Sequence, residues 1–387
     1  MEPIRFNFQH STFFLHTSPM PTGQSLLREP PEAWPVRGAF LLLNPRLDAG
    51  LRRRVLAAEF PDLPDHAWLA TSGTGGRLKI VALSRAALEA GAAAVNAHLA
   101  ATARDVWINP LPLFHAGGLG IVVRSALSGA RWIGSAPWNP ASFVRDAEDA
   151  GATLASLVPA QVHDLVSSRA MSPPSLRAIV VGGGALDETL RACAADLGWP
   201  LLPSYGLTET ASQVATALIG AIGFSALPLL PHVGARIDES GVLSLRGPSL
   251  LTGWILLGED GAARWEDPKS DGWLRTGDRA ELTGRNLRVL GRVDDLVKIR
   301  GELVDVAALE RALQARVGSD RVGVLAADDE RNGGALHVVA SDADAAEAAR
   351  AALDVFPPFA RPESVTIGGI PRTALGKIIR RGGGTLG

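Results

Sequence analysis

Short apolar segments alternate with helical segments over much of the chain, and this alternation limits the fold more than any other feature of the sequence. Residues 84–103 predict a helix that begins after Ser84, a suitable N-cap, and residues 120–130 predict a buried helix. Residues 151–160 and 175–185 each predict a short buried strand followed by a loop. Apolar strands that alternate with helices are typical of an α/β fold with a mainly parallel sheet.

The pattern changes twice towards the C-terminus. After about residue 231, short strand patterns separated by Gly and Asp turns predict a smaller β-rich subdomain. From about Asp295, an amphipathic helix at 304–317 is followed by alternating strand and helix patterns, which predict a compact α+β domain. We therefore expect an N-terminal core at 1–293 and a small mobile C-terminal α+β lid domain at 294–387.

Composition and charge argue against several classes of protein. The 387 residues, 47% of them hydrophobic, allow two or more domains, and 38 Lys and Arg against 40 Asp and Glu indicate no nucleic-acid partner. The single Cys193 allows no disulfide within the chain and is expected to pack in the core. The N-terminus lacks a signal-peptide pattern, and the apolar stretch 215–231 is too short to span a bilayer. We therefore expect a cytoplasmic protein without membrane insertion.

One stretch, TSGTGGRLK at 71–79, combines hydroxyl side chains, glycines and a lysine. It is not a Walker A loop, because the lysine does not directly follow the last glycine. Glycines still let several backbone N–H groups turn towards one point, so such a loop between a strand and a helix can hold a polyphosphate. A flexible linker is the alternative. The candidate phosphate-binding residues are Thr71, Ser72, Gly73, Thr74, Gly75, Gly76 and Lys79.

Four later stretches carry further chemistry. Thr208 and Glu209 place a hydroxyl beside a carboxylate, which suits a phosphate oxygen and Mg²⁺. Asp278, expected in a tight turn, can accept hydrogen bonds from the vicinal hydroxyls of a ribose. Residues 289–302 mix charge and glycine, and Lys377 follows a glycine near the C-terminus. Each stretch alone is also compatible with a turn, a cap or a solvated charge cluster, so their order along the chain is the informative observation.

That order resembles the adenylate-forming superfamily of acyl-CoA synthetases, luciferases and nonribosomal peptide adenylation domains, from about residue 67 onwards. TSGTGGRLK is similar to the phosphate loop, PLFHAGG to the histidine motif, VVGGGAL to the adenine-wall loop and YGLTET to the central motif. RTGD is similar to the ribose-binding motif, GRVDDLVKIRGE to the interdomain hinge and PRTALGK to the C-terminal lysine motif. Seven motifs in one order identify the chain as a member of this superfamily.

The resemblance implies a role for each motif. Residues 71–79 hold the β- and γ-phosphates of ATP, Thr208 binds the α-phosphate and Glu209 binds Mg²⁺. Lys377 bridges the carboxylate of the acid and the α-phosphate, and Asp294 is the hinge about which the C-terminal domain rotates. The implied catalytic residues are Lys377, His115, Thr208 and Glu209. The adenine packs against Gly182, Gly183, Gly184 and Tyr205, and the ribose binds to Asp278 and Arg292. His115 gates the acyl pocket.

These residue types suit a reaction in two steps. When a carboxylate attacks the α-phosphorus of ATP, two anions approach each other, and Lys377, Mg²⁺ and the loop donors offset the repulsion. The acyl-adenylate then loses AMP to a thiol, which is CoA in the acyl-CoA synthetases. In this superfamily the small domain turns between the two steps, and a hinge between two domains permits such a rotation.

The sequence departs from the superfamily pattern in three places. Gly75 stands where Thr is usual and Leu78 where Pro is usual, so we expect a looser phosphate loop and weaker ATP binding. KIRGE replaces the usual turn after the hinge, so the thiol channel is expected to differ. Only about 70 residues precede the phosphate loop, which is fewer than in most members, so part of the usual N-terminal subdomain is expected to be missing or reduced.

A narrower resemblance indicates the acid. The short N-terminal region, residues 111–130 and residues 205–216 are similar to the o-succinylbenzoate–CoA ligases of menaquinone and phylloquinone biosynthesis. A dicarboxylate needs a cationic or hydroxyl partner for its second carboxylate. Arg124 is one candidate, although a structural ion pair on its helix is the alternative. The substrate candidates are Arg124, Ser212 and Gln213, with His115 and Ser204 as further ones.

Three alternatives stay open at this point. The chain is also compatible with a CoA ligase for another aryl or acyl acid, with an enzyme that loads a carrier protein, and with a degenerate nucleotide-binding relative. The presence of both Lys377 and the hinge argues against the last of these. CoA and carrier-bound pantetheine offer the same thiol, so the sequence does not separate them. Ligases of this kind are often dimers, but the sequence shows no interface for a homodimer.

Overall fold

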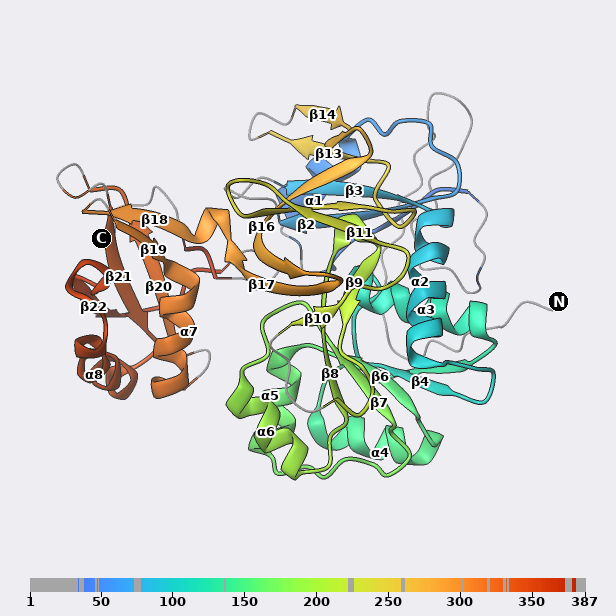
Figure 1. Cartoon of the computed structure of the whole chain (residues 1–387), viewed down its shortest axis with the longest axis horizontal. Helices are drawn as coiled ribbons and strands as arrows, with labels where there is room; N and C mark the ends of the chain where they lie inside the picture. The colour runs from blue at the N-terminus through green and yellow to red at the C-terminus, as the bar shows by residue number, and fades with distance from the viewer. Residues whose placement is uncertain are drawn as a thin grey trace.

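The structure, a computed structural model, describes most of the chain after residue 37 (Figure 1). The described residues are 34, 38–45, 47, 49–72, 78–135, 137–221, 226–258, 262–300, 302–318, 321–329, 332, 334–372 and 378–380, with Ser72 described for its backbone only. None of the helices in these ranges is long and apolar enough to cross a membrane.

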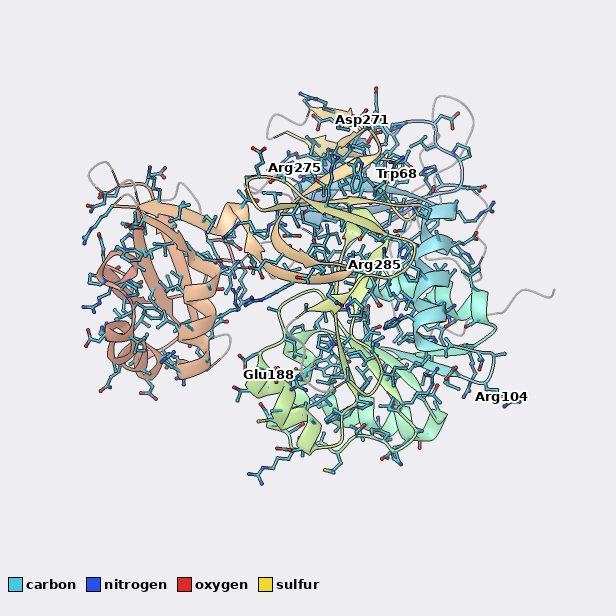
Figure 2. The ribbon with its side chains drawn as sticks, in the orientation of Figure 1. Trp68, Arg104, Glu188, Asp271, Arg275 and Arg285 are labelled. Carbon is cyan, nitrogen blue, oxygen red and sulfur yellow. The ribbon has the colours of Figure 1, made fainter. Side chains whose placement is uncertain are left out.

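The first sheet has five strands in the order β1-β2-β3-β13-β14. Only β1 and β2 pair in parallel, and the other pairs are antiparallel. The strands are β1 (Phe40–Leu42), β2 (His66–Ser72), β3 (Leu78–Ser84), β13 (Gly253–Leu257) and β14 (Ala263–Glu266), and helix α1 spans Ala49–Ala57. Trp68 of β2, labelled in Figure 2, is fully buried and its ring lies edge-on to the rings of Phe60 and Trp265. Because β13 and β14 come from beyond residue 231, the β-rich region also supplies two strands to this sheet.

The second sheet has six strands in the order β5-β4-β6-β7-β8-β9. All pairs are parallel except β8 with β9, which confirms the expected α/β fold with a mainly parallel sheet. The strands are β4 (Val106–Asn109), β5 (Arg131–Gly134), β6 (Leu154–Leu157), β7 (Ala178–Val181), β8 (Leu201–Leu207) and β9 (Ser212–Thr216).

Helices cover both faces of this second sheet. One face packs on α2 (Arg85–Leu99) and α3 (Ala116–Ser128) through residues such as Val95 and Ile121. The other face packs on α4 (Pro140–Ala150), α5 (Pro159–Ser167) and α6 (Glu188–Asp196). Strands that are buried on both faces are apolar throughout, which is why the sequence showed continuous apolar runs here.

The helix boundaries follow the capping residues. Ser84 accepts a hydrogen bond from the backbone N–H of Ala87 at 3.1 Å, as expected of an N-cap. Helix α2 ends at Leu99, before the expected residue 103, because Ala100 adopts a left-handed conformation with φ of 47°.

The expectation that Cys193 packs in the core is wrong, because this residue lies on the exposed side of α6.

The third sheet is antiparallel, with the order β10-β17-β16-β12-β11, and β15 pairs with β16. Its strands are β10 (Leu227–Pro228), β11 (Gly234–Ile237), β12 (Val242–Arg246), β15 (Lys269–Ser270), β16 (Trp273–Thr283) and β17 (Asn286–Arg292). Side chains of β9 pack into the core of this sheet. Arg285, labelled in Figure 2, precedes β17 and donates hydrogen bonds to the carbonyls of Leu230 at 2.9 Å and Val233 at 3.2 Å.

After β17 a short 3₁₀ helix, η3 (Val293–Asp295), leads into the C-terminal part, which lies to one side of the other sheets in Figure 1. This part contains β18 (Leu296–Ile299), β19 (Glu302–Asp305), α7 (Val306–Val317), β20 (Val322–Ala327), β21 (Ala335–Ala340), α8 (Ala343–Ala352) and β22 (Ser364–Ile367), with the 3₁₀ helices η4 (Leu353–Val355) and η5 (Pro358–Ala360). The apolar face of α7 is buried in a core of its own, as its pattern predicted.

Candidate functional site

The base of the phosphate loop lies in the first sheet. Thr71 and Ser72 end β2, and they pair in antiparallel register with Lys79 and Leu78 at the start of β3. The expected position between a strand and a helix is therefore wrong, because the loop connects two strands of a hairpin. Gly73, Thr74, Gly75 and Gly76 lie outside the described residues. A phosphate at this hairpin would depend on backbone N–H groups and hydroxyls, without a helix N-terminus.

Lys79 faces an aromatic ring. Its Nζ lies 4.0 Å from the ring centroid of Trp254 on β13, a cation–π distance. The indole N–H of Trp254 donates in turn to Glu266 at 3.2 Å. Trp254 was not among the sequence candidates, because its contact with Lys79 depends on the pairing of β3 with β13, which no local pattern indicates.

The triple-glycine loop follows β7 at its carboxyl end. A Cβ atom added at Gly182 would lie 2.9 Å from Oγ of Ser204, and Gly183 has a φ of 78°. The Ser204 hydroxyl donates to the carbonyl of Val181 at 3.0 Å, which holds β8 against this loop. Gly184 also follows β7, near Pro159. Ligands commonly bind beyond the carboxyl ends of parallel strands, so this edge of the second sheet is a candidate binding edge.

Tyr205, Asp278 and Arg292 come together between the second and third sheets. The Tyr205 hydroxyl donates to Oδ2 of Asp278 at 2.5 Å, and Nη1 of Arg292 donates to Oδ1 at 3.0 Å. Burial, and then the neighbouring carboxylate of Asp278, raise the pKa of Tyr205 well above its usual value. The expectation of a tight turn at Asp278 is wrong, because this residue lies within β16, directly opposite Arg292 on β17.

Arg292 also reaches the expected hinge. Its Nη2 donates to Oδ2 of Asp294 in η3 at 3.2 Å. One guanidinium therefore contacts Asp278, an expected ribose-binding residue, and Asp294, the expected hinge residue.

Thr208 and Glu209 belong to a short 3₁₀ helix, η2 (Thr208–Thr210), which connects β8 to β9. The carbonyl of Glu209 accepts a hydrogen bond from the N–H of Leu251 at 2.8 Å, and both side chains are half-buried. The described residues contain no group of three or more His, Cys, Asp or Glu side chains that could hold a metal ion. Mg²⁺ is often held by one or two carboxylates together with the phosphates of a substrate, and Glu209 fits that arrangement.

His115 occupies the N-cap position of α3 and is exposed. Its ring centroid lies 4.6 Å from that of Phe114. Gly118, in the first turn of α3, permits the preceding loop to approach closely, since an added Cβ atom would lie 2.3 Å from the carbonyl oxygen of Pro112.

Arg124 is the most deeply buried cation of the candidate set, with 1% of its surface exposed. Its Nη2 donates to the Ser212 hydroxyl at 3.2 Å, and the Gln213 amide oxygen, when turned towards the guanidinium, accepts at 3.0 and 3.3 Å. Gly120, one turn earlier, leaves room for this guanidinium, since a Cβ atom there would lie 3.1 Å from Nη2. The structure therefore brings together Arg124, Ser212 and Gln213, three of the substrate candidates.

No carboxylate in the described part of the chain accompanies this cation. Among the described residues, Arg124 forms no ion pair, its Nε is buried without a hydrogen-bond partner, and its Cζ lies 5.6 Å from the ring centroid of Trp107. Burial lowers the pKa of Arg124 to about 10, so the guanidinium stays protonated at neutral pH. The alternative of a structural ion pair on the helix is therefore wrong for the described residues.

A family model described as AMP-binding enzyme matches residues 58–254, about half of the sequence. The chain belongs to the AMP-binding enzyme family. It is 30% identical over 332 residues to the 2-succinylbenzoate–CoA ligase of Bacillus mycoides (strain KBAB4), covering 80% of this chain and 68% of that protein. It is 30% identical over 280 residues to the ligase of the same name from Bacillus cereus (strain AH820), covering 68% of this chain and 57% of that protein.

Solved structures agree with this membership. The o-succinylbenzoate CoA synthetase of Bacillus subtilis in complex with its acyl-adenylate intermediate superimposes with a TM-score of 0.72 at 25% identity, over 81% of this chain and 68% of that chain. The same synthetase in complex with ATP and a magnesium ion gives a TM-score of 0.70 at 25% identity, over 84% of this chain and 72% of that chain. The fold expected from the sequence is therefore confirmed, whereas the present chain spans only 57% to 68% of the length of the two curated relatives described above.

Proposed function

We propose that the protein is an ATP-dependent acid–CoA ligase that acts on 2-succinylbenzoate. In the first step the acid and ATP form an acyl-adenylate and pyrophosphate. In the second step the thiol of CoA displaces AMP and forms the thioester. The family match and the names of the relatives support the reaction class.

The buried, unpaired guanidinium of Arg124 carries the proposal for a dicarboxylate. An isolated buried charge is costly unless a counter-charge compensates for it, and the described residues provide none. One carboxylate of 2-succinylbenzoate reacts with ATP, so the other is available to Arg124. Ser212 and Gln213, which contact the guanidinium, complete the polar end of the acid pocket, while His115 and Ser204 line the acid pocket in this proposal.

We propose a nucleotide site at the junction of the three sheets. We assign the ribose hydroxyls to Asp278 and Arg292, and the adenine to Tyr205 and the loop of Gly182, Gly183 and Gly184. The hydrogen bond from Tyr205 to Asp278 supports this assignment, because it joins the adenine-side strand to the ribose-side strand at 2.5 Å. The phosphates extend towards Thr208 and the β2–β3 hairpin, whose residues from Thr71 to Gly76 and Lys79 hold them.

The electrostatics of the first step follow from these placements. Glu209 would hold Mg²⁺, which supplies positive charge to the phosphates when it is bound, and the Thr208 hydroxyl would bind the α-phosphate. Lys377, which lies outside the described residues, neutralises the anionic carboxylate and α-phosphate as they approach each other. The regions 1–293 and 294–387 turn about Asp294 between the two steps, and this rotation removes Lys377 before CoA enters.

The test is the formation of AMP and thioester by purified protein with ATP, Mg²⁺ and CoA, across acids that include 2-succinylbenzoate, benzoate and succinate. Turnover of 2-succinylbenzoate alone is the expected result. Turnover of a different acid would contradict the substrate, AMP without CoA thioester would indicate a carrier-protein acceptor, and inactivity with every acid would refute the ligase proposal.

A matched variant separates the two steps. Lys377→Ala should lose adenylation but still convert supplied acyl-adenylate and CoA to thioester. Normal adenylation by this variant would refute the role of Lys377. Size-exclusion chromatography of the same protein distinguishes a monomer from a homodimer.

A further inference from the structure

Three charged side chains of the C-terminal part, Asp295, Glu310 and Arg380, form a cluster that the proposed mechanism does not use. Arg380 lies three residues after Lys377 in the sequence. Its guanidinium contacts a carboxylate from η3 on one side and a carboxylate from α7 on the other. The cluster therefore joins the C-terminal end of the described chain to two other elements.

The contact with α7 is deeply buried. Oε1 of Glu310 accepts a hydrogen bond from Nη2 of Arg380 at 2.5 Å, and Oε2 accepts from the N–H of Val324 on β20 at 3.0 Å. The Glu310 side chain is only 2% exposed. A carboxylate buried so deeply needs both partners, so the Arg380 side chain is fixed relative to α7 and β20.

The second contact reaches the hinge. Nη1 of Arg380 lies 3.5 Å from Oδ1 of Asp295, whose side chain is 15% exposed. Asp295 directly follows Asp294 and belongs to the same 3₁₀ helix. The guanidinium therefore connects the expected pivot to the body of the C-terminal part.

Backbone contacts hold the chain around Arg380 against β20. The carbonyl of Arg380 accepts from the N–H of Ala326 at 2.7 Å, and the N–H of Ile379 donates to the carbonyl of Pro371 at 2.9 Å. Gly323 of β20 permits this approach, since an added Cβ atom would lie 2.7 Å from Cγ2 of Ile370. These contacts hold the described chain against β20 and join the segments on either side of residues 373–377 to each other.

We propose that Arg380 is a positioning residue that ties the chain next to Lys377 to the hinge, so that rotation at Asp294 moves this chain and α7 as one body. The inference rests on the proposed two-step ligase. A rotation delivers a distant lysine accurately only when the intervening structure is rigid, and a misplacement of about 1 Å can cost a hundredfold in rate. The Arg380 cluster supplies that rigidity between the hinge and β20.

The first test is Asp295→Asn, which weakens the hinge contact and leaves the buried pair of Arg380 and Glu310 in place. Acyl-adenylate formation, followed as pyrophosphate release, should fall roughly tenfold. Thioester formation from supplied acyl-adenylate and CoA should change by less than about twofold, because that step does not need Lys377. Arg361→Ala is the matched control, since Arg361 pairs with the exposed Asp354 in the same part of the chain, and it should leave both rates unchanged.

A second pair of variants examines Arg380 itself. Arg380→Lys keeps the charge and should retain more adenylation activity than the double variant Arg380→Met with Glu310→Met, which removes both members of the buried ion pair. The backbone N–H of Ile379 should exchange with solvent faster in the double variant than in the wild type, measured without ATP or acid.

Equal losses in the two half-reactions, or unchanged rates in both Asp295→Asn and the double variant, would overturn the inference. So would unchanged exchange at Ile379 in the double variant. If the wild-type protein forms no adenylate with any acid, the ligase proposal fails, and the exchange measurement still decides whether Arg380 holds this chain.

Discussion

Replacing Arg124 by Met gives opposite predictions for activity and for stability. Arg124→Met removes the charge and keeps much of the side-chain volume. In the structure this guanidinium is 1% exposed, touches Ser212 and Gln213, and has no carboxylate partner among the described residues. If the second carboxylate of the substrate is that partner, the charge contributes to binding of the acid and costs stability when the acid is absent.

The magnitudes follow from the same contacts. Truncating one member of a buried, hydrogen-bonded charge pair costs about 2–5 kcal/mol, or roughly thirtyfold to several thousandfold in kcat/KM for the dicarboxylate. The variant loses hydrogen bonds to two side chains, worth about 1 kcal/mol each, but it also removes an uncompensated buried charge that costs several kcal/mol. The free energy of unfolding without acid should therefore be unchanged or higher than in the wild type.

Two measurements on the purified variant check this reasoning. Steady-state kinetics should show a large loss of kcat/KM for 2-succinylbenzoate and little change in KM for ATP. Urea unfolding should show a midpoint no lower than that of the wild type. Arg145→Met, at a position that is 65% exposed, is the control and should change neither quantity. An unchanged kcat/KM for 2-succinylbenzoate, or a free energy of unfolding that is several kcal/mol lower than in the wild type, would refute the role of Arg124.

The remaining predictions concern other buried groups. Burial lowers the pKa of His232 to about 4 from its usual 6.5, so the folded state binds a proton at this residue less readily than the unfolded chain does. The free energy of unfolding should therefore fall as the pH drops from about 6.5 to about 4. The expected loss is about 2 kcal/mol after allowance for partial exposure of the ring. His232→Gln should flatten thermal unfolding temperature against pH over that range. The raised pKa of Tyr205 keeps its hydroxyl protonated, so the stability due to this group should persist up to pH 10 and decrease only above it. Tyr205→Phe should raise KM for ATP, and an unchanged KM would contradict the proposed place of Tyr205 beside the nucleotide. Gly206→Ala would place a Cβ atom 1.8 Å from the carbonyl oxygen of Ser212 and should destabilise the fold by about 3 kcal/mol, whereas Gly369→Ala, with open space around it, should be nearly neutral in urea unfolding.

Local patterns predicted those parts of the fold that local interactions determine. Ser84 caps α2 through a contact three residues away, and the apolar runs of β6 and β7 follow from burial on both faces of one sheet. Helical spacing likewise placed α7 with its apolar side in a core. Each of these features depends on residues that are close in the sequence, so periodicity and capping were sufficient to find them.

Non-local pairing explains what the sequence did not predict. β13 joins β3 across more than 160 positions, so nothing near Gly253 indicated which sheet it would complete. The RTGD motif was expected to form a tight turn. In the structure Gly277 lies within β16, where a Cβ atom would be 2.4 Å from Nη2 of Arg292. The glycine therefore allows a close approach of Arg292, and the sequence alone does not distinguish this use of glycine from a turn.

The candidate site shows the same division between local and non-local information. Arg124, Ser212 and Gln213 could be named as substrate candidates because a resemblance pointed to a dicarboxylate. Their meeting, and the absence of a carboxylate partner in the described part of the chain, required β9 and α3 to be placed against each other. Trp107 and Trp254, whose rings face Arg124 and Lys79, carried no signal in the sequence, because each ring meets its cation only through tertiary packing.

Two consecutive residues next to the candidate site carry backbone strain. Ala211 and Ser212 both have positive φ values, 53° and 104°, which cost about 1–3 kcal/mol each in residues other than glycine. The buried hydroxyl of Thr210 offsets part of this cost, because it bonds with the backbone of Leu207 and with the carbonyl of Ser212. Strain of this kind persists only where the surrounding structure enforces it. Here it turns Ser212 towards Arg124 only three residues after Glu209, so the strained turn fixes the acid end and the phosphate end of the proposed site relative to each other.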